Sequence, residues 1–199
     1  GANAARGPAA VLAWKRGLAD DQEADPTQLA LQLQELRDWA QERGLLLERD
    51  ASYVKAILNI ERTGAKIRKD ITTWSDISHE IEYFFDDKFA LTKETALSLI
   101  APVSAADAAS AAKALCQSYN PSEDKDTWFN NVKKIAESLG YTSDTKAYKA
   151  NPSAFKGTVS DIAKVFRVLL TGRAQTPDLH SVMAVMGKER CLKRLNILG

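Results

Sequence analysis

Residues 162–195 read IAKVFRVLLTGRAQTPDLHSVMAVMGKERCLKRL, and this stretch predicts three short helices joined by tight turns. Gly172 suits the left-handed residue that ends the first helix. Thr176 is expected to cap the next helix, with Pro177 at its first position. Basic side chains would then lie near a helix N-terminus. The first helix should bury the residues that recur with the i, i+3, i+4, i+7 spacing of one helical face: Ile162, Val165, Phe166 and Leu169.

The charge of the chain is polarised along the sequence. The 199 residues carry 27 Lys and Arg against 26 Asp and Glu, a net charge of +1. Residues 155–199 hold eight basic and three acidic side chains, whereas the remainder holds 19 and 23. An excess of positive charge favours a polyanionic partner. A polyanionic partner therefore suits residues 155–199 better than the rest of the chain, and the alternative from charge alone is a solvated face whose asymmetry is accidental.

Helical periodicity runs through the rest of the chain, and no sustained alternation of apolar and polar residues indicates a sheet. The fold is predicted to be all-α, with two consecutive helical subdomains. The first is placed at residues 25–90 and the second at residues 91–199, because an acidic, aromatic segment gives way to short helices between them. Residues 1–24 have little periodicity and are assigned to a flexible lead or a remnant of the expressed sequence. No apolar run approaches the ~18 residues of a membrane span, so no membrane association is expected.

Three segments carry a resemblance to a known family, in the family's order. They are ASYVKAILNIERTGAKIRKDITTWSDISHEIEYFFDD (51–87), YKANPSAFKGTVSDIAKVFRV (148–168) and the pattern RVLLTGR…TPDL…VMGKER…RL (167–195). The chain resembles the C-terminal, anticodon-binding region of bacterial glutamyl-tRNA synthetases, which are class I aminoacyl-tRNA synthetases. The resemblance covers most of residues 50–199, and residues 1–49 match loosely.

The resemblance implies a full-length enzyme that attaches glutamate to tRNA with ATP and Mg²⁺. The His-x-Gly-His element and the Lys-rich signature loop of class I synthetases do not occur in this sequence. Nor is Gly187-Lys188-Glu189-Arg190 a P-loop, because the upstream glycine is missing. The two histidines and two cysteines lack the spacing of a metal site. We therefore expect no catalytic residue, metal or cofactor in this stretch, and no activity from it alone.

Arg167 is the residue that the sequence favours most for RNA contact. It lies at the edge of an apolar helical face, so its planar fork can leave the core and pair with a phosphate or a base edge. The residues alone leave a second interpretation, a surface salt bridge to Asp161 or Asp178. In the family the matching arginine contacts anticodon bases. Lys164 and Arg173 belong to the same basic group, and lysines are expected to hold phosphates.

Thr176, Pro177 and Leu179 resemble the short loop and helix start on which the family rests the last anticodon bases. A helix N-terminus presents N–H groups and partial positive charge, and Pro177 with Leu179 would form an apolar platform for an unstacked base. For Thr176 alone, helix capping is the other interpretation, and it is compatible with RNA contact. His180 stands where the family often has an aromatic residue, and an imidazole can also stack.

A second basic cluster lies in the first predicted subdomain. Helical spacing places Arg62, Lys66 and Lys69 on one face, although Gly64 interrupts it. In the family this region helps to read the first anticodon base through an arginine, and the match here is either Arg62 or Arg68. A solvated, charged helix is the alternative.

The preferred function is recognition of the tRNA anticodon by the non-catalytic part of a glutamate–tRNA ligase. Its partner is expected to be glutamate tRNA, with glutamine tRNA left open, and the protein is expected to be a cytoplasmic monomer. The alternative is a helical protein-interaction scaffold whose basic end docks an acidic partner. RNA binding should weaken as the salt concentration rises.

Overall fold

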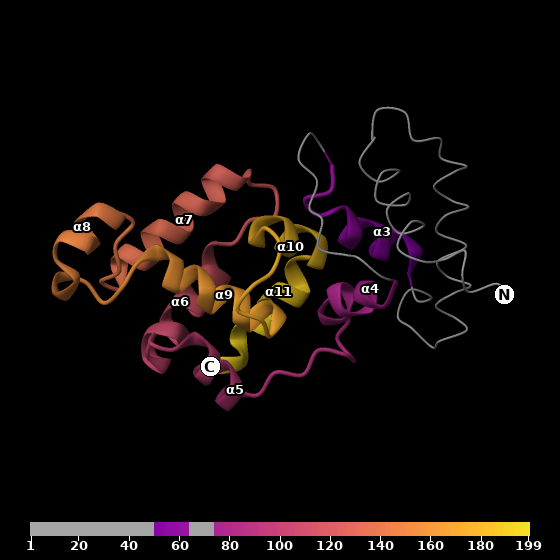
Figure 1. Cartoon of the computed structure of the whole chain (residues 1–199), viewed down its shortest axis with the longest axis horizontal. Coiled ribbons are helices and arrows are strands. Elements are labelled where there is room, and N and C mark those ends of the chain that lie inside the picture. The colour runs from indigo at the N-terminus through magenta and orange to yellow at the C-terminus, as the bar shows by residue number, and fades with distance from the viewer. Residues whose placement is uncertain (1–49, 64–73) are drawn as a thin grey trace. The chain divides into compact units, whose positions relative to one another are not determined.

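The computed structural model describes residues 50–63 and 74–199 (Figure 1). The chain divides into two compact units, residues 1–88 and 89–199. Every regular element in the described ranges is a helix, apart from one isolated bridge between Thr142 and Thr158. The predicted all-α fold is confirmed. The assignment of the two predicted subdomains to anticodon binding stays a prediction.

In the described part of the first unit, two α-helices and a 3-10 helix enclose apolar side chains. α3 (Ala51–Asn59) begins at Asp50, whose carboxylate accepts a hydrogen bond from the N–H of Tyr53 at 3.0 Å. α4 (Trp74–Ile81) leads into η3 (Glu82–Phe84). The Tyr53 hydroxyl donates to the carbonyl of Phe84 at 3.1 Å, and the two rings meet edge to face. This contact ties the start of α3 to the end of η3.

The second unit contains seven α-helices and two 3-10 helices. In chain order these are α5 (Lys93–Ile100), α6 (Ala105–Ser118), α7 (Lys125–Ser138), α8 (Thr145–Ala150), η4 (Pro152–Ala154), α9 (Val159–Thr171), α10 (Leu179–Met186), α11 (Lys188–Leu195) and η5 (Asn196–Leu198). Five of the α-helices begin at a side chain that accepts a hydrogen bond from the first turn, and these N-caps are Thr92, Ser104, Asp124, Asp144 and Asp178. Each cap satisfies an N–H that the helix itself leaves unpaired.

α9 is the central helix of the second unit. It contacts α5, α6, α7 and α11, and Figure 1 shows it between α7 and α5. The predicted buried face is confirmed, because its four residues are 0% exposed. Four further residues of the helix are also buried, so little of its surface reaches solvent; they are Val159, Val168, Leu170 and Thr171. A narrow strip that includes Lys164 and Arg167 stays partly exposed.

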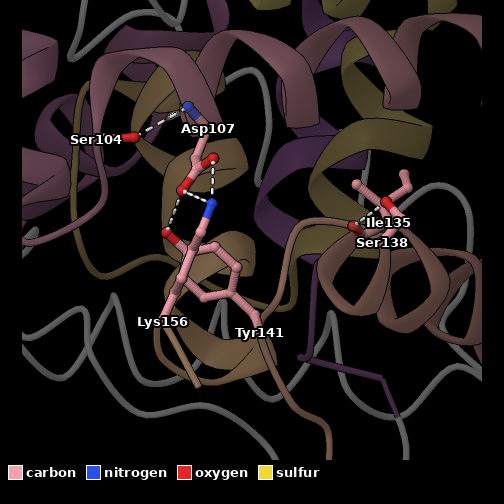
Figure 2. Close-up of polar contacts among 6 residues, drawn as sticks. All are labelled: Ser104, Asp107, Ile135, Ser138, Tyr141 and Lys156. Atoms are coloured by element: carbon pink, nitrogen blue, oxygen red, sulfur yellow. Dashed lines mark hydrogen bonds and ion pairs between the residues drawn. The ribbon is translucent and has the colours of Figure 1, made fainter. Parts of the chain in front are cut away.

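A polar network fixes the chain just before α9 (Figure 2). The Lys156 ammonium lies 3.0 Å from both carboxylate oxygens of Asp107, and the Tyr141 hydroxyl donates to the same carboxylate at 3.2 Å. Burial raises the pKa of Tyr141 to about 12, and the charge of Asp107 adds to this effect, so the hydroxyl keeps its proton at neutral pH. Gly157 follows, where a Cβ would stand 2.6 Å from an oxygen of Asp161. The start of α9 therefore leaves no room for a side chain at this position.

Among the described residues, no single helix has the length and apolar composition needed to cross a bilayer. Together, α5 and α6 meet the length and composition criteria, but the chain bends by 100° between them.

Candidate nucleic-acid interface

Arg167 lies on the partly exposed strip of α9, near its C-terminal end. Its Nε donates a hydrogen bond to Thr176 Oγ1 at 2.9 Å. Within the described part of the chain, Arg167 makes no ion pair, and its two Nη atoms have no hydrogen-bond partner. Asp161 and Asp178, the acids considered as salt-bridge partners, bind other groups. The salt-bridge interpretation of Arg167 is therefore wrong, and its Nη atoms are left without a partner among the described residues.

The turn after α9 brings the following loop back to Arg167. Gly172 has φ 70° and ψ 11°, the left-handed conformation predicted for it. The Thr171 hydroxyl donates to the carbonyl of Arg167 at 2.7 Å and accepts from the N–H of Arg173 at 3.2 Å. These bonds reverse the chain, so that Thr176 lies beside Arg167.

Asp178 caps α10, and the prediction that Thr176 is the cap, with Pro177 as the first helical residue, is wrong. The backbone N–H and the hydroxyl of Ser181 donate to Asp178 Oδ2 at 3.0 and 2.8 Å. The Thr176 hydroxyl is engaged elsewhere, because it accepts from Arg167 and donates to the carbonyl of Pro177 at 2.9 Å. A carboxylate also suits the partial positive charge of a helix N-terminus.

Asp178 also joins α10 to α7. Its Oδ1 lies 2.7 Å from the Nζ of Lys125, the first residue of α7. Burial alone would raise the pKa of Asp178, but hydrogen bonds from Lys125 and Ser181 outweigh it and lower the pKa below its usual value. The carboxylate is therefore ionised at neutral pH. It holds residues 176–178, which we call the corner, against the start of α7.

Leu179 and His180 pack against the protein. Leu179 is only 3% exposed, so the predicted base platform cannot include it. The His180 Nε2 lies 2.9 Å from the carbonyl oxygen of Glu123, and its ring centroid is 5.8 Å from that of Trp128. Base stacking on His180 would compete with these contacts. Pro177 is half-buried and supplies the remaining apolar surface of the predicted platform.

The other two predicted cations of this region, Lys164 and Arg173, lie on either side of Arg167 in the sequence. Lys164 Nζ donates to the carbonyl of Ala101 at 3.3 Å, at the C-terminal end of α5. Arg173 is half-buried in the turn, where its backbone N–H is bound to Thr171. The structure thus brings Arg167 to the corner, whereas Lys164 also anchors a neighbouring helix.

Arg62, in the first unit, is fully buried with 0% exposure. Its Nη1 donates to the carbonyl of Leu58 at 2.7 Å and so satisfies one of the last carbonyls of α3. The prediction that Arg62 lies on an accessible basic face is wrong, because its guanidinium is held inside the fold. Arg68, the alternative, and the neighbouring Lys66 and Lys69 lie outside the described residues.

Sequence reasoning missed the roles of Asp178 and Lys125 at the corner. A local signal existed for the cap, since Asp178 precedes Ser181 by three residues, as an N-cap precedes the N–H it binds. Thr176 offered a competing cap two residues earlier. No sequence signal pointed to Lys125, because its contact depends on how α7 packs against α10.

The interface can act through hydrogen-bond donors and positive charge. The Nη edge of Arg167 matches a pair of acceptor atoms, and Pro177 offers apolar surface beside it. Within residues 50–63 and 74–199, no three His, Cys, Asp or Glu side chains are grouped as a metal site would require.

Comparisons with known proteins agree with the resemblance in the sequence. A family model described as "Anticodon binding domain" matches residues 28–198. A glutamate–tRNA ligase of Clostridium perfringens (strain 13 / Type A) is 42% identical over 146 residues, which are 72% of this chain and 26% of that protein. The glutamate–tRNA ligase of Sorangium cellulosum is 36% identical over 162 residues, or 79% of this chain and 28% of that protein. The glutamate–tRNA ligase of Acetivibrio thermocellus is 34% identical over 153 residues, which are 77% of this chain and 27% of that protein.

The chain spans about a quarter of the length of these curated relatives. The family model, in contrast, matches most of the chain, including both described parts of the first unit and almost all of the second. The chain therefore belongs to the anticodon-binding domain family.

Proposed function

We propose that this chain recognises the anticodon of glutamate tRNA, as the RNA-reading part of a glutamate–tRNA ligase. The observation that carries the proposal is Arg167, whose Nε is held by Thr176 while its Nη atoms bind no described residue. An arginine fork in this state can pair with two acceptor atoms on a base edge or on a phosphate. The family match and the glutamate–tRNA ligase relatives support the same function.

Anticodon bases splay out of the loop, and their edges are read by Arg167 while Pro177 contacts a base face. Lys164 and Arg173 add positive charge for the phosphates, which fixes the position of the RNA without reading its sequence. In the first unit, Arg68 is the remaining candidate for the first anticodon base. The two units thus serve as consecutive anticodon-binding subdomains.

The ligase as a whole attaches glutamate to tRNA with ATP and Mg²⁺, and this stretch supplies none of that chemistry. The protein acts in the cytoplasm as a monomer. Glutamate tRNA is the partner, and glutamine tRNA is a second partner if the ligase is non-discriminating.

The test is a titration of the chain with a glutamate tRNA anticodon stem-loop and with loops that differ at single anticodon bases. Arg167→Ala removes the fork and should cost about 1 to 3 kcal/mol of binding to the glutamate loop, with a smaller effect on the swapped loops. Arg190→Ala is the matched control, because it removes a half-buried arginine on α11 that donates to the carbonyl of Met186. It should change affinity for all loops by a similar, smaller factor.

Equal and weak binding of the unmodified chain to every loop would contradict the proposal. That outcome would favour a scaffold whose basic end docks an acidic protein. Unchanged affinity and base preference in Arg167→Ala would show that Arg167 does not read a base.

A further inference from the structure

Arg167 is held at one of its three guanidinium nitrogens. Its Nε–H donates a hydrogen bond to the Thr176 hydroxyl oxygen at 2.9 Å. That hydroxyl in turn donates to the Pro177 carbonyl, also at 2.9 Å. A hydroxyl that donates to a fixed carbonyl presents its lone pairs in a defined direction. We propose that Thr176 is a positioning residue, whose hydroxyl orients the Arg167 guanidinium for base recognition. This inference rests on the proposed function.

The bond at Nε decides which edge of the fork is available. A guanidinium can pair with two acceptors through Nε and one Nη, or through both Nη atoms. Because Thr176 occupies Nε, Arg167 is left with the second mode. The ligand must therefore offer two neighbouring acceptor atoms to the Nη edge. Cytosine (N3 and O2) and guanine (O6 and N7) each have two neighbouring acceptor atoms on one edge. In adenine, each edge places the N6 amino donor next to an acceptor.

The corner is rigid enough to hold Arg167 in this way. Thr176 lies two residues before Asp178, which is bound on one side by Ser181 and on the other by Lys125 at 2.7 Å. At the other end of the loop, the Thr171 hydroxyl bonds to the carbonyl of Arg167 at 2.7 Å. The backbone of Arg167 and the acceptor of its side chain are thus fixed by separate bonds, which limits the rotamers that the arginine can adopt.

The inference is tested by a double-mutant cycle between Thr176→Val and Arg167→Ala in the full chain. Thr176→Val keeps the shape of the side chain and removes the hydroxyl, and Thr176→Ser restores it. The readout is the ratio of dissociation constants for the swapped and the glutamate anticodon stem-loops. Thr145→Val, at the exposed start of α8, is the matched control for the same chemical change.

We expect Thr176→Val to lower this ratio by about 5- to 10-fold, the net worth of one ordinary intramolecular hydrogen bond, while Thr176→Ser keeps it. In the Arg167→Ala background, Thr176→Val should have a much smaller effect, because the Thr176 hydroxyl acts through the arginine. A full effect of Thr176→Val in that background would mean that Thr176 acts independently of Arg167 and would overturn the inference. An unchanged ratio in Thr176→Val would overturn it too.

The failures of the two proposals can be told apart. If Arg167→Ala leaves base preference intact, anticodon recognition by Arg167 fails, and the inference that rests on it fails with it. A spectroscopic measurement on the free protein tests the hydrogen bond between Thr176 and Arg167 separately. The Nε–H proton of Arg167 should exchange slowly with water in the unmodified chain and quickly in Thr176→Val. Fast exchange in the unmodified chain would show that the hydrogen bond is absent in solution.

Discussion

The two ends of α9 use polar side chains in opposite ways. At the N-terminal end, the carboxylate of Asp107 receives Lys156 and Tyr141, and Asp161 binds the N–H of Thr158. These groups satisfy one another within the fold, and Figure 2 shows Lys156 and Tyr141 at the carboxylate of Asp107. At the C-terminal end, Arg167 is held at Nε by Thr176, and its two Nη atoms bind no described residue.

On a helix that is buried almost all round, satisfied and unsatisfied polar groups have different roles. A polar group whose bonds are satisfied inside the protein stabilises the fold, and its loss should appear as lost stability. A charged fork that is fixed in place but left without an acceptor among the described residues is prepared for a partner. Changes at the first end should therefore alter the free energy of unfolding, and changes at the second end should alter RNA recognition.

The largest expected effect is that of Gly157→Ala at the N-terminal end. The added Cβ would lie 2.6 Å from Asp161 Oδ2 and 3.0 Å from the Tyr141 ring. Asp161 cannot move away without losing its 2.7 Å bond to the N–H of Thr158. We expect a loss of about 2 to 4 kcal/mol in the free energy of unfolding, from overpacking and the weakened helix start. Urea denaturation measures it.

Gly199→Ala is the control for Gly157→Ala, because its Cβ would meet its nearest neighbour, the carbonyl of Asn196, at 3.5 Å. It should leave stability unchanged. Base preference of the folded fraction should stay as in the unmodified chain for both variants. If Gly157→Ala altered base preference and left stability intact, the division between the two ends of α9 would not hold.

The sequence predicted the buried face of α9 because that face follows from helical periodicity. Ile162 and Phe166 are four residues apart and both are fully buried. The cap of α10 could not be predicted as safely, since Thr176 and Asp178 are both good caps two residues apart. In the folded chain the Thr176 hydroxyl accepts from Arg167, 9 residues earlier, and Asp178 caps α10.

Contacts between residues that are far apart in the sequence could not be predicted either, because they depend on how the helices pack in the folded chain. His180 meets the carbonyl of Glu123, 57 residues away, and this requires α7 to lie against α10.

The burial of Arg62 could not be predicted from the pattern of charges along the sequence. Its place in a basic cluster suggested an exposed face, but a guanidinium can also satisfy carbonyls at a helix end, as Arg62 does for Leu58.

A smaller effect is expected for Asp178→Ala at the corner. The change removes the N-cap of α10 and the partner of Lys125, so the free energy of unfolding should fall by about 1 to 2 kcal/mol at pH 7. Asp178→Ser keeps a capping oxygen and should recover most of this loss, because an ion pair with an exposed lysine contributes little. Recovery by less than half would show that the charge of Asp178 matters more than the cap.

The effect of Asp178 should depend on pH with a definite sign. Its pKa is lower in the folded chain than the ordinary value of 3.8, so the folded state favours the ionised carboxylate. The stabilisation is fully present above pH 3.8 and is lost as the pH falls through the lowered pKa. The difference in stability between the unmodified chain and Asp178→Ala should therefore narrow below pH 3.8. A difference that stayed constant down to the acid transition would contradict the lowered pKa.

The smallest effect is expected for Gly172→Ala, which tests the turn that returns the loop to Arg167. With φ at 70°, an alanine here is strained by about 1 kcal/mol, although its Cβ would lie at an ordinary 3.7 Å from the Phe89 ring. Gly172→Asn should cost less, because asparagine tolerates the left-handed conformation. Thermal unfolding of both variants measures the strain. If alanine and asparagine proved equally destabilising, crowding against Phe89 and not backbone conformation would explain the glycine.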